Sequence, residues 1–221
     1  MAITNGYCTL ANFKADKRIQ PYSIDIGDDG VIEDIIADAS RLIDQVCNRT
    51  FYSRTETRYY DIPSAPYSNQ YEVRSIESGV LKFDDDLLAI TTLTNGDGTT
   101  IASTQYNLLD YNKPRKHSLQ LKDSSTVNWT ADASGNTRAV ISIAGTWGYV
   151  NRAATDADSV RVISNTARAC RMIAMHEYLK RFGKSEEVAQ ITGAGVVIVP
   201  SGEIPKEAFG LINNYQRYGL A

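Results

Sequence analysis

Residues 29–47, DGVIEDIIADASRLIDQVC, carry an apolar pattern around which the rest of the chain can be organised. The apolar residues recur three and four positions apart, which is the spacing of one buried face of an α-helix. Asp28 and Asp29 precede that face, where an N-cap and the helix dipole favour negative charge. The stretch therefore predicts a helix from about 29 to 47, with an apolar face formed by Val31, Ile32, Ile35, Ile36, Ala39, Leu42, Ile43 and Val46.

Three further segments show helical patterns that can cover this face. A long helix is expected over residues 160–184, with basic residues in its last turn and Gly183 as a C-cap. A short helix is expected within residues 9–18, and a last one begins at Pro205 and ends before Gly219. Because apolar faces at both chain ends need one another, the helices from both ends are expected to pack as one bundle.

The spacing of the apolar residues changes between residues 52 and 149. Short runs rich in β-branched and aromatic residues alternate there with turn-forming residues, which predicts antiparallel strands. The sequence Asn95-Gly96-Asp97-Gly98 predicts a tight hairpin turn, since both dipeptides tolerate positive φ. The predicted fold class is α+β: an α-helical bundle from residues 1–51 and 150–221, an inserted antiparallel β region at 52–149, and an extended C-terminal arm from about residue 184.

Composition limits the function classes. The 221 residues include 23 basic and 26 acidic side chains, so the net charge of −3 offers no positive field for gripping nucleic acid. No run of 18 apolar residues and no signal-peptide pattern occur, so a protein made in the cytoplasm with no membrane association is expected. Cys8, Cys47 and Cys170 lack any CxxC spacing and are expected to be reduced, buried thiols.

No catalytic or metal-binding constellation emerges from the sequence. His176 begins an HExxH pattern, but Lys180 stands where the second histidine would be, and His117 in its basic loop is expected to be solvated. Residues 84–86 are three consecutive aspartates, for which a solvated turn is the favoured interpretation. A cation site or a hydrolase using Asp84 and Asp86 is the rival. The expectation is a protein that is not an enzyme and has no cofactor.

Two apolar sets have more than one interpretation. The tyrosines of residues 52–71 suit either a subunit interface or a sheet face with aromatic cross-strand pairs. The segment 194–200, AGVVIVP, is either a strand crossing the core or a patch that a neighbouring molecule covers. The helix 29–47 carries a row of acidic residues that would repel phosphates if it lined a DNA channel.

Taken in order, several segments together resemble the head-to-tail connector (adaptor, or head-completion) family of tailed bacteriophages. The matching segments are TLANFK (9–14), IADASRLIDQVCNRTFY (36–52), TRYYD (57–61), LLAITTLTNGDGT (87–99), GTWGY (145–149), VRVISNTARACRMIAMHEYLKRF (160–182) and IPKEAFGLINNYQRYG (204–219).

The resemblance implies a structural virion protein of the phage neck, made in the host cytoplasm. Such a protein forms a homo-oligomeric ring, usually of twelve copies, below the portal protein; it extends the DNA channel and provides a docking platform for the next connector or tail-completion protein. DNA passes through the ring without specific binding. The helical bundle would form the ring body, with residues 191–221 facing the portal.

Site residues follow as hypotheses from this resemblance and from the surface patterns. A subunit or portal interface would use Val196, Val197, Ile198, Val199, Phe209, Tyr215, Tyr59 and Tyr60. The channel lining would include Asp34, Asp38 and Asp44, and a tail-side loop would comprise Asn95, Gly96, Asp97 and Gly98. The main alternative is a tail-completion or receptor-facing virion protein whose β region binds a protein or carbohydrate ligand.

Overall fold

The computed structural model describes residues 5–19, 24, 26–63, 79–182, 189–192, 195–198 and 204–217. Helix α2, Asp29–Cys47, confirms the helix expected at 29–47. It buries one apolar face and ends where Asn48 adopts a left-handed conformation, with φ of 49°. An Asn in this conformation is a common helix terminator, because its short polar side chain tolerates positive φ.

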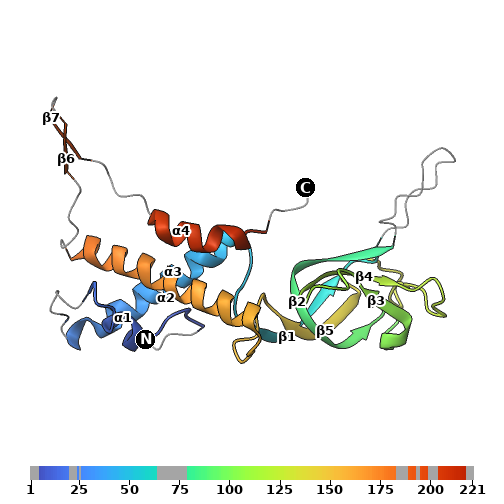
Figure 1. Cartoon of the computed structure of the whole chain (residues 1–221). Coiled ribbons are helices and arrows are strands. Elements are labelled where there is room, and N and C mark those ends of the chain that lie inside the picture. The colour runs from blue at the N-terminus through green and yellow to red at the C-terminus, as the bar shows by residue number, and fades with distance from the viewer. Residues whose placement is uncertain are drawn as a thin grey trace. The chain divides into compact units, whose positions relative to one another are not determined.

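Helix α3, Ala157–Arg181, packs against α2 (Figure 1). The carboxylate of Asp156 accepts a hydrogen bond from the Ser159 amide at 2.9 Å and so caps the helix. The helix therefore begins at Ala157, three residues before the expected start at residue 160. The Sγ of Cys170 lies 3.8 Å from the Ile36 carbonyl oxygen of α2. Val160 in the first turn is exposed, and the buried residues of α3 begin at Val162.

Both chain ends add to this helix pair. Helix α1, Leu10–Lys14, buries Phe13, whose ring makes an edge contact with Tyr178 of α3 at 5.8 Å. Helix α4, Lys206–Ile212, follows Pro205 as expected and continues into a 3-10 turn, Asn213–Tyr215. The Arg217 amide donates to the Cys47 carbonyl at 2.8 Å, so the segment after α4 is held at the end of α2.

The chain forms two compact units (Figure 1). The helical unit consists of residues 1–51 with 153–221, and the β unit consists of residues 52–152. Helices together with an antiparallel sheet confirm the expected α+β class. Within the described residues, every helix is too short or too polar to span a lipid bilayer.

The β unit contains a five-stranded antiparallel sheet with the strand order β1-β5-β2-β4-β3. One hydrophobic core on the sheet includes Leu87, Leu119 and Trp147, all fully buried. The strands are β1 (Arg54–Tyr60), β2 (Val80–Thr94), β3 (Tyr106–Leu108), β4 (Lys116–Leu121) and β5 (Ile141–Trp147). A separate two-stranded sheet joins β6 (Ala189–Thr192) to β7 (Gly195–Ile198) within the expected C-terminal arm.

The interpretation of residues 84–86 as a solvated turn is wrong. These aspartates lie inside β2, a single strand of 15 residues that pairs first with β4 and then with β5. The register of β2 against β4 shifts between Lys82 and Leu87, and Asp85 and Asp86 are buried there. Buried carboxylates require charged or hydrogen-bonding partners, which the neighbouring strands supply.

Gly145 lies where the backbones of β5 and β2 approach closely. A Cβ atom built on Gly145 would lie 2.4 Å from the carbonyl oxygen of Ala89 in β2. The register between the two strands is irregular on both sides of this point, at Leu87–Ala89 and Ile90–Thr92. Only a residue without a side chain fits there unless the two backbones separate.

Gly145→Ala should therefore destabilise the β unit by about 1–3 kcal/mol, because the added methyl group forces β5 away from β2. Urea unfolding followed by tryptophan fluorescence measures this, since Trp129 and Trp147 both belong to the β unit. The control is Gly30→Ala in α2, where an added Cβ meets no atom within 4 Å. Circular dichroism should show Gly30→Ala to be neutral or slightly stabilising. Equal stability of the Gly145→Ala variant and the parent would contradict the tight approach.

Candidate functional site

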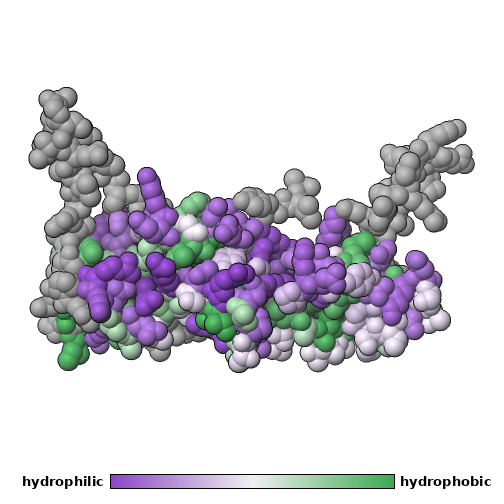
Figure 2. Space-filling model, viewed as in Figure 1, coloured by the Kyte–Doolittle hydropathy of each residue, from purple (hydrophilic) through white to green (hydrophobic). Residues whose placement is uncertain are grey.

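A groove of about 440 Å³ lies between α2 and α3 on the helical unit. Its floor is apolar, with Ile35 and Ile173 contributed by the two helices, and its rim is charged. Hydrophilic residues cover most of the face of this unit that Figure 2 shows. The residues lining the groove are Ile35, Asp38, Ala39, Arg41, Leu42, Gln45, Ile173, Glu177 and Lys180.

Two of the three residues expected to line a DNA channel share one exposed side of α2. Asp34 and Asp38 are both exposed, and their spacing of four residues places them one turn apart on the same face. Asp38 also lines the groove between α2 and α3. A negative stripe at this position is available to a channel or to a neighbouring molecule.

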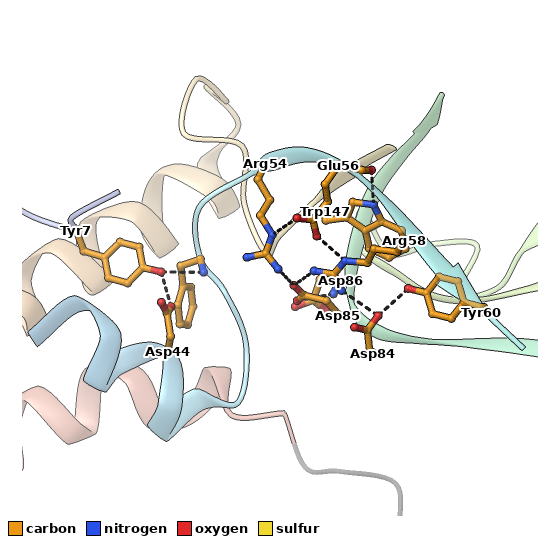
Figure 3. Close-up of polar contacts among 11 residues, drawn as sticks. Tyr7, Asp44, Arg54, Glu56, Arg58, Tyr60, Asp84, Asp85, Asp86 and Trp147 are labelled. Atoms are coloured by element: carbon orange, nitrogen blue, oxygen red, sulfur yellow. Dashed lines mark hydrogen bonds and ion pairs between the residues drawn. The ribbon is translucent and has the colours of Figure 1, made fainter. Parts of the chain in front are cut away.

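Asp44, the third residue, does not belong to that stripe. It is half-buried and accepts a short hydrogen bond from the Tyr7 hydroxyl (Figure 3). It also pairs with Arg41 at 3.3 Å. The Phe51 amide donates to the same Tyr7 oxygen at 3.0 Å. Six residues along a helix correspond to about 240° of rotation from Asp38, so Asp44 faces the N-terminal segment instead. Asp44 therefore lies apart from Asp34 and Asp38, and its place in a channel lining stays a prediction.

Burial raises the pKa of Tyr7, and the neighbouring Asp44 carboxylate raises it further. The Tyr7 hydroxyl therefore stays protonated and donates a hydrogen bond to the Asp44 carboxylate. This contact holds the N-terminal segment against α2, and the Tyr7 ring also meets the Phe51 ring edge-on at 5.9 Å. The tyrosine thus has a structural task within the subunit.

The expected C-terminal interface residues have different surroundings. Phe209 on α4 is 41% exposed, which leaves a large apolar ring at the surface. Tyr215 is half-buried: its ring packs edge-on against Phe51 at 5.8 Å, and its hydroxyl accepts a hydrogen bond from Asn165 at 2.9 Å. Residues 196–198 belong to β7, whose backbone pairs with β6, whereas Val199 lies outside the described residues.

The two tyrosines of β1 correspond to the two interpretations of the tyrosine cluster. The ring of Tyr60 lies 5.8 Å from Phe83 and 6.1 Å from Trp147, and its hydroxyl donates to Asp84 at 2.6 Å. Tyr59, on the other face of β1, is 65% exposed. Tyr60 therefore serves packing within the sheet, and Tyr59 remains a candidate for contact with another molecule.

The tight turn after β2 forms as expected, but only part of it reaches the surface. The Gly98 amide donates to the Asn95 carbonyl at 3.0 Å. The Asn95 side chain is buried, donating to the Asn128 carbonyl at 2.8 Å and accepting from the Thr130 amide at 3.1 Å. Within the expected tail-side loop, Asp97 and Gly98 are exposed and Asn95 is buried, and a role for the loop toward the tail stays a prediction.

The β unit contains a charge cluster that sequence reasoning missed, formed by Arg54, Glu56, Arg58, Asp84 and Asp85. The Arg58 guanidinium contacts Glu56 at 2.6 Å, Asp84 at 2.9 Å and Asp85 at 3.0 Å (Figure 3). It also stacks over the Trp147 ring, with 4.6 Å between Cζ and the ring centroid. The available signal was the alternation in β1, which places Arg54, Glu56 and Arg58 on one face.

The electrostatics of this cluster favour the charged forms of Glu56, Asp84 and Arg58. Burial alone would raise the pKa of Glu56, but hydrogen bonds from Arg58 and Arg54 outweigh it and lower that pKa. Burial alone would also raise the pKa of Asp84, but hydrogen bonds from Tyr60 and Arg58 outweigh it, so the pKa is lowered overall. Burial disfavours the charge of Arg58, yet its carboxylate partners raise its pKa. The cluster therefore holds the sheet together and is not poised for proton transfer.

His117 is not a solvated histidine, contrary to the sequence-based expectation. Its Nε2 lies 2.8 Å from Oδ1 of Asp86, which is fully buried, and its Nδ1 lies 2.9 Å from Oδ2 of Asp110. The imidazole thus bridges β2 and the segment between β3 and β4. In the described part of the chain, no group of three or more His, Cys, Asp or Glu side chains is arranged to hold a metal ion.

No protein-family model matches this sequence, and no curated protein matches it significantly. Among solved structures, the chain is similar in fold to a chain from the neck of an empty GTA (gene transfer agent) particle, with a TM-score of 0.53 and 11% identity over 100% of this chain and 95% of that chain. That neck structure was computed with six-fold symmetry. A chain from the neck of a native GTA particle, with twelve-fold symmetry, has a TM-score of 0.52 and 11% identity over 100% and 94%.

The likeness spans the whole chain and confirms, at the level of the fold, the resemblance to phage neck proteins. At 11% identity the shared property is the fold itself.

Arg58→Met should lower the free energy of unfolding of the β unit by about 3 kcal/mol, because the buried Asp85 and the neighbouring carboxylates lose their central cation. Urea unfolding followed by tryptophan fluorescence measures the loss. Arg161→Met removes an exposed ion pair with Asp158 in the helical unit and is the control. Urea unfolding followed by circular dichroism, which reports on the helices, should show a change of less than about 0.5 kcal/mol. Equal losses of unfolding free energy in the two variants would show that the Arg58 contacts stabilise the protein no more than an exposed ion pair does.

Acid should weaken the β unit in a defined range of pH. The pKa values of Glu56 and Asp84 are lowered in the folded protein, so their contribution is complete above the ordinary values of 4.5 and 3.8. It is lost as the pH falls through the lower folded values, because the unfolded chain then binds more protons. Urea midpoints measured from pH 6 to pH 2 should fall most steeply below about pH 4.5. The Arg58→Met variant should show a shallower slope, and parallel slopes would contradict this origin.

Proposed function

We propose that this chain is a structural protein of the neck of a phage-like particle, and more specifically a head-to-tail connector that forms a ring below the portal. The observation that carries the proposal is the fold likeness to neck chains of GTA particles, which extends over the whole chain and over 95% of one neck chain. The segments quoted from the sequence point to the same family independently. Fold alone does not imply function, so the ring and its contacts require their own tests.

A ring of identical copies needs two different surfaces on each subunit that fit one another head to tail. The neck structures similar to this chain have six-fold and twelve-fold symmetry. In this chain, Phe209 and Tyr59 expose large aromatic rings, and the groove between α2 and α3 is open. These features, together with the apolar residues 196–198 of β7, are the candidates for contacts between subunits or with the portal.

The C-terminal part of the chain is the proposed portal-facing element. The β6–β7 sheet has only two strands, and an isolated two-stranded sheet is marginally stable in water. Its strand β7 consists of Gly195 followed by three apolar residues. Contact with a portal or a neighbouring copy would stabilise such a sheet. The β unit, including the exposed Asp97 and Gly98, is the proposed surface for the next connector or tail protein.

The acidic stripe of Asp34 and Asp38 supports a passive role toward DNA. Each phosphate contact strengthens binding to DNA, and carboxylates make such contacts unfavourable. A channel wall carrying these two residues would let the duplex pass without holding it. Because the chain has a net charge of −3, the proposal assigns it no specific nucleic-acid site.

Replacing Val197 and Ile198 together by Asp should abolish assembly while the subunit stays folded, because buried apolar contacts would be replaced by unpaired charges. Native mass spectrometry of the protein mixed with its portal measures the ring. Twelve copies of 24.4 kDa amount to about 293 kDa in addition to the portal. Portal must be present, since connectors of this family can remain monomeric without it.

The control exchanges the two side chains, Val197→Ile with Ile198→Val, which keeps the apolar volume and should leave assembly intact. Circular dichroism establishes that both variants are folded. Rings of normal mass formed by the double Asp variant would refute a role for β7 in assembly. A stable trimer of the parent chain would instead favour a receptor-facing virion protein.

A further inference from the structure

We infer that Cys8 and Cys170 form a reversible disulfide when the protein passes from a reducing to an oxidising environment. The two residues are 162 positions apart in the sequence, yet their Sγ atoms lie 3.4 Å from each other. Cys8 is 3% exposed and Cys170 is fully buried. The inference concerns the chain itself and goes beyond the proposed function, because it does not require a ring.

The pair is held together by the packing of the N-terminal segment, residues 5–9, against the helical unit. The Tyr7 amide donates to Oγ of Ser40 in α2 at 3.0 Å, and Arg41 donates to the Asn5 carbonyl at 3.0 Å. These two contacts, made by the adjacent residues Ser40 and Arg41 of α2, fix the backbone that precedes Cys8. The Cys8 thiol is thereby directed at the middle of α3.

Cys170 occupies a corresponding fixed position on α3. Its Sγ lies 3.4 Å from Oγ of Ser40 and 3.8 Å from the Ile36 carbonyl, so it is enclosed by α2 on one side. A disulfide bond measures about 2.05 Å, so the two sulfurs have to approach by about 1.3 Å. Residues 5–9 belong to no helix or strand. That segment can take up the movement more easily than the packed helix α3.

The required oxidant is a small disulfide of the oxidised-glutathione class. The Cys8 thiolate attacks one sulfur of this molecule, whose S–S bond breaks to give a mixed disulfide and one small thiol. The Cys170 thiolate then attacks Sγ of Cys8, forms the protein disulfide and releases the second small thiol. The two cysteines lose two electrons and two protons, and the small disulfide takes them up as two thiols.

Cys8 is the residue that reacts first, because it lies outside the helices in a short segment that is exposed at both ends, at Asn5 and Thr9. The hydrogen bond to Cys170, together with burial, raises the pKa of Cys8 while the segment is closed. Reaction therefore follows local opening of residues 5–9, which is less costly than opening α3. Cys170 is in place to complete the bond when the segment closes again.

The bond would fasten residues 5–9 to the centre of the helical unit. It would also close a loop that contains α2 and the entire β unit, and cross-links that close long loops restrict the unfolded chain most. In the reducing interior of a cell the thiols stay free, whereas outside it small disulfides can oxidise them. The result would be a protein that is more resistant to unfolding after release from the cell.

The test compares purified full-length protein incubated with oxidised glutathione and with dithiothreitol. Oxidation should lower the intact mass by about 2 Da, and alkylation after unfolding should modify one cysteine instead of three. Peptide mapping should join the peptides that contain Cys8 and Cys170. The thermal midpoint should rise by about 5 °C or more and return to its starting value on reduction.

Cys47 provides the matched control. It is as buried as Cys170, but its Sγ lies against the Ile212 carbonyl, at 3.6 Å. Cys47→Ser should retain the mass change and the thermal shift, whereas Cys8→Ser and Cys170→Ser should each lose both. Because Cys8 lies outside the helices, Cys8→Ser carries the test even where Cys170→Ser proves unstable.

Three alkylated cysteines in the oxidised parent protein would overturn the inference. So would covalent dimers in place of the internal bond, or an unchanged mass loss in Cys8→Ser. All of these measurements use the chain without portal, so their failure leaves the proposed ring untouched. Equally, failure of the ring assay leaves the cysteine pair as described.

Discussion

The contact between α2 and α3 is the one on which the other parts of the structure depend. Ile36 and Ser40 of α2 meet Cys170 of α3 at the centre of this contact. The N-terminal segment and α4 then pack onto the same pair of helices, through Tyr7 and Ile212. Because residues from both ends of the chain build one unit, the β unit is inserted between them and both of its connections lead into the helical unit.

The β unit differs from the helical unit because it buries charged side chains within a sheet. Its strand β2 carries two buried aspartates, and such groups are tolerated only where cations or hydrogen-bond donors meet them. Arg58 and His117 meet that requirement, and Trp147 covers the Arg58 guanidinium. A sheet held in this way has a specific register, since slipping by one residue would separate the charges.

Several features could be predicted from the sequence, and each rests on local interactions. The helix at 29–47, the helix after Pro205 and the turn at Asn95–Gly98 all form where expected. Predictions that required knowledge of distant partners were less successful. Residues 84–86 lie inside a strand and not in a turn, because the side chains that pair with them come from other strands, and His117, expected to be solvated, contacts the buried Asp86.

The tyrosines and the cysteines show the same limit. Alternation along β1 indicates that Tyr59 and Tyr60 face opposite ways, but only the position of Trp147 reveals which ring is packed and which is exposed. Cys8 and Cys170 have no spacing that relates them, and they meet because α2 brings the N-terminal segment onto α3. Periodicity and turn chemistry act between residues a few positions apart, so they can be read along the chain. Burial, charge pairing and thiol contact arise between residues that only folding brings together.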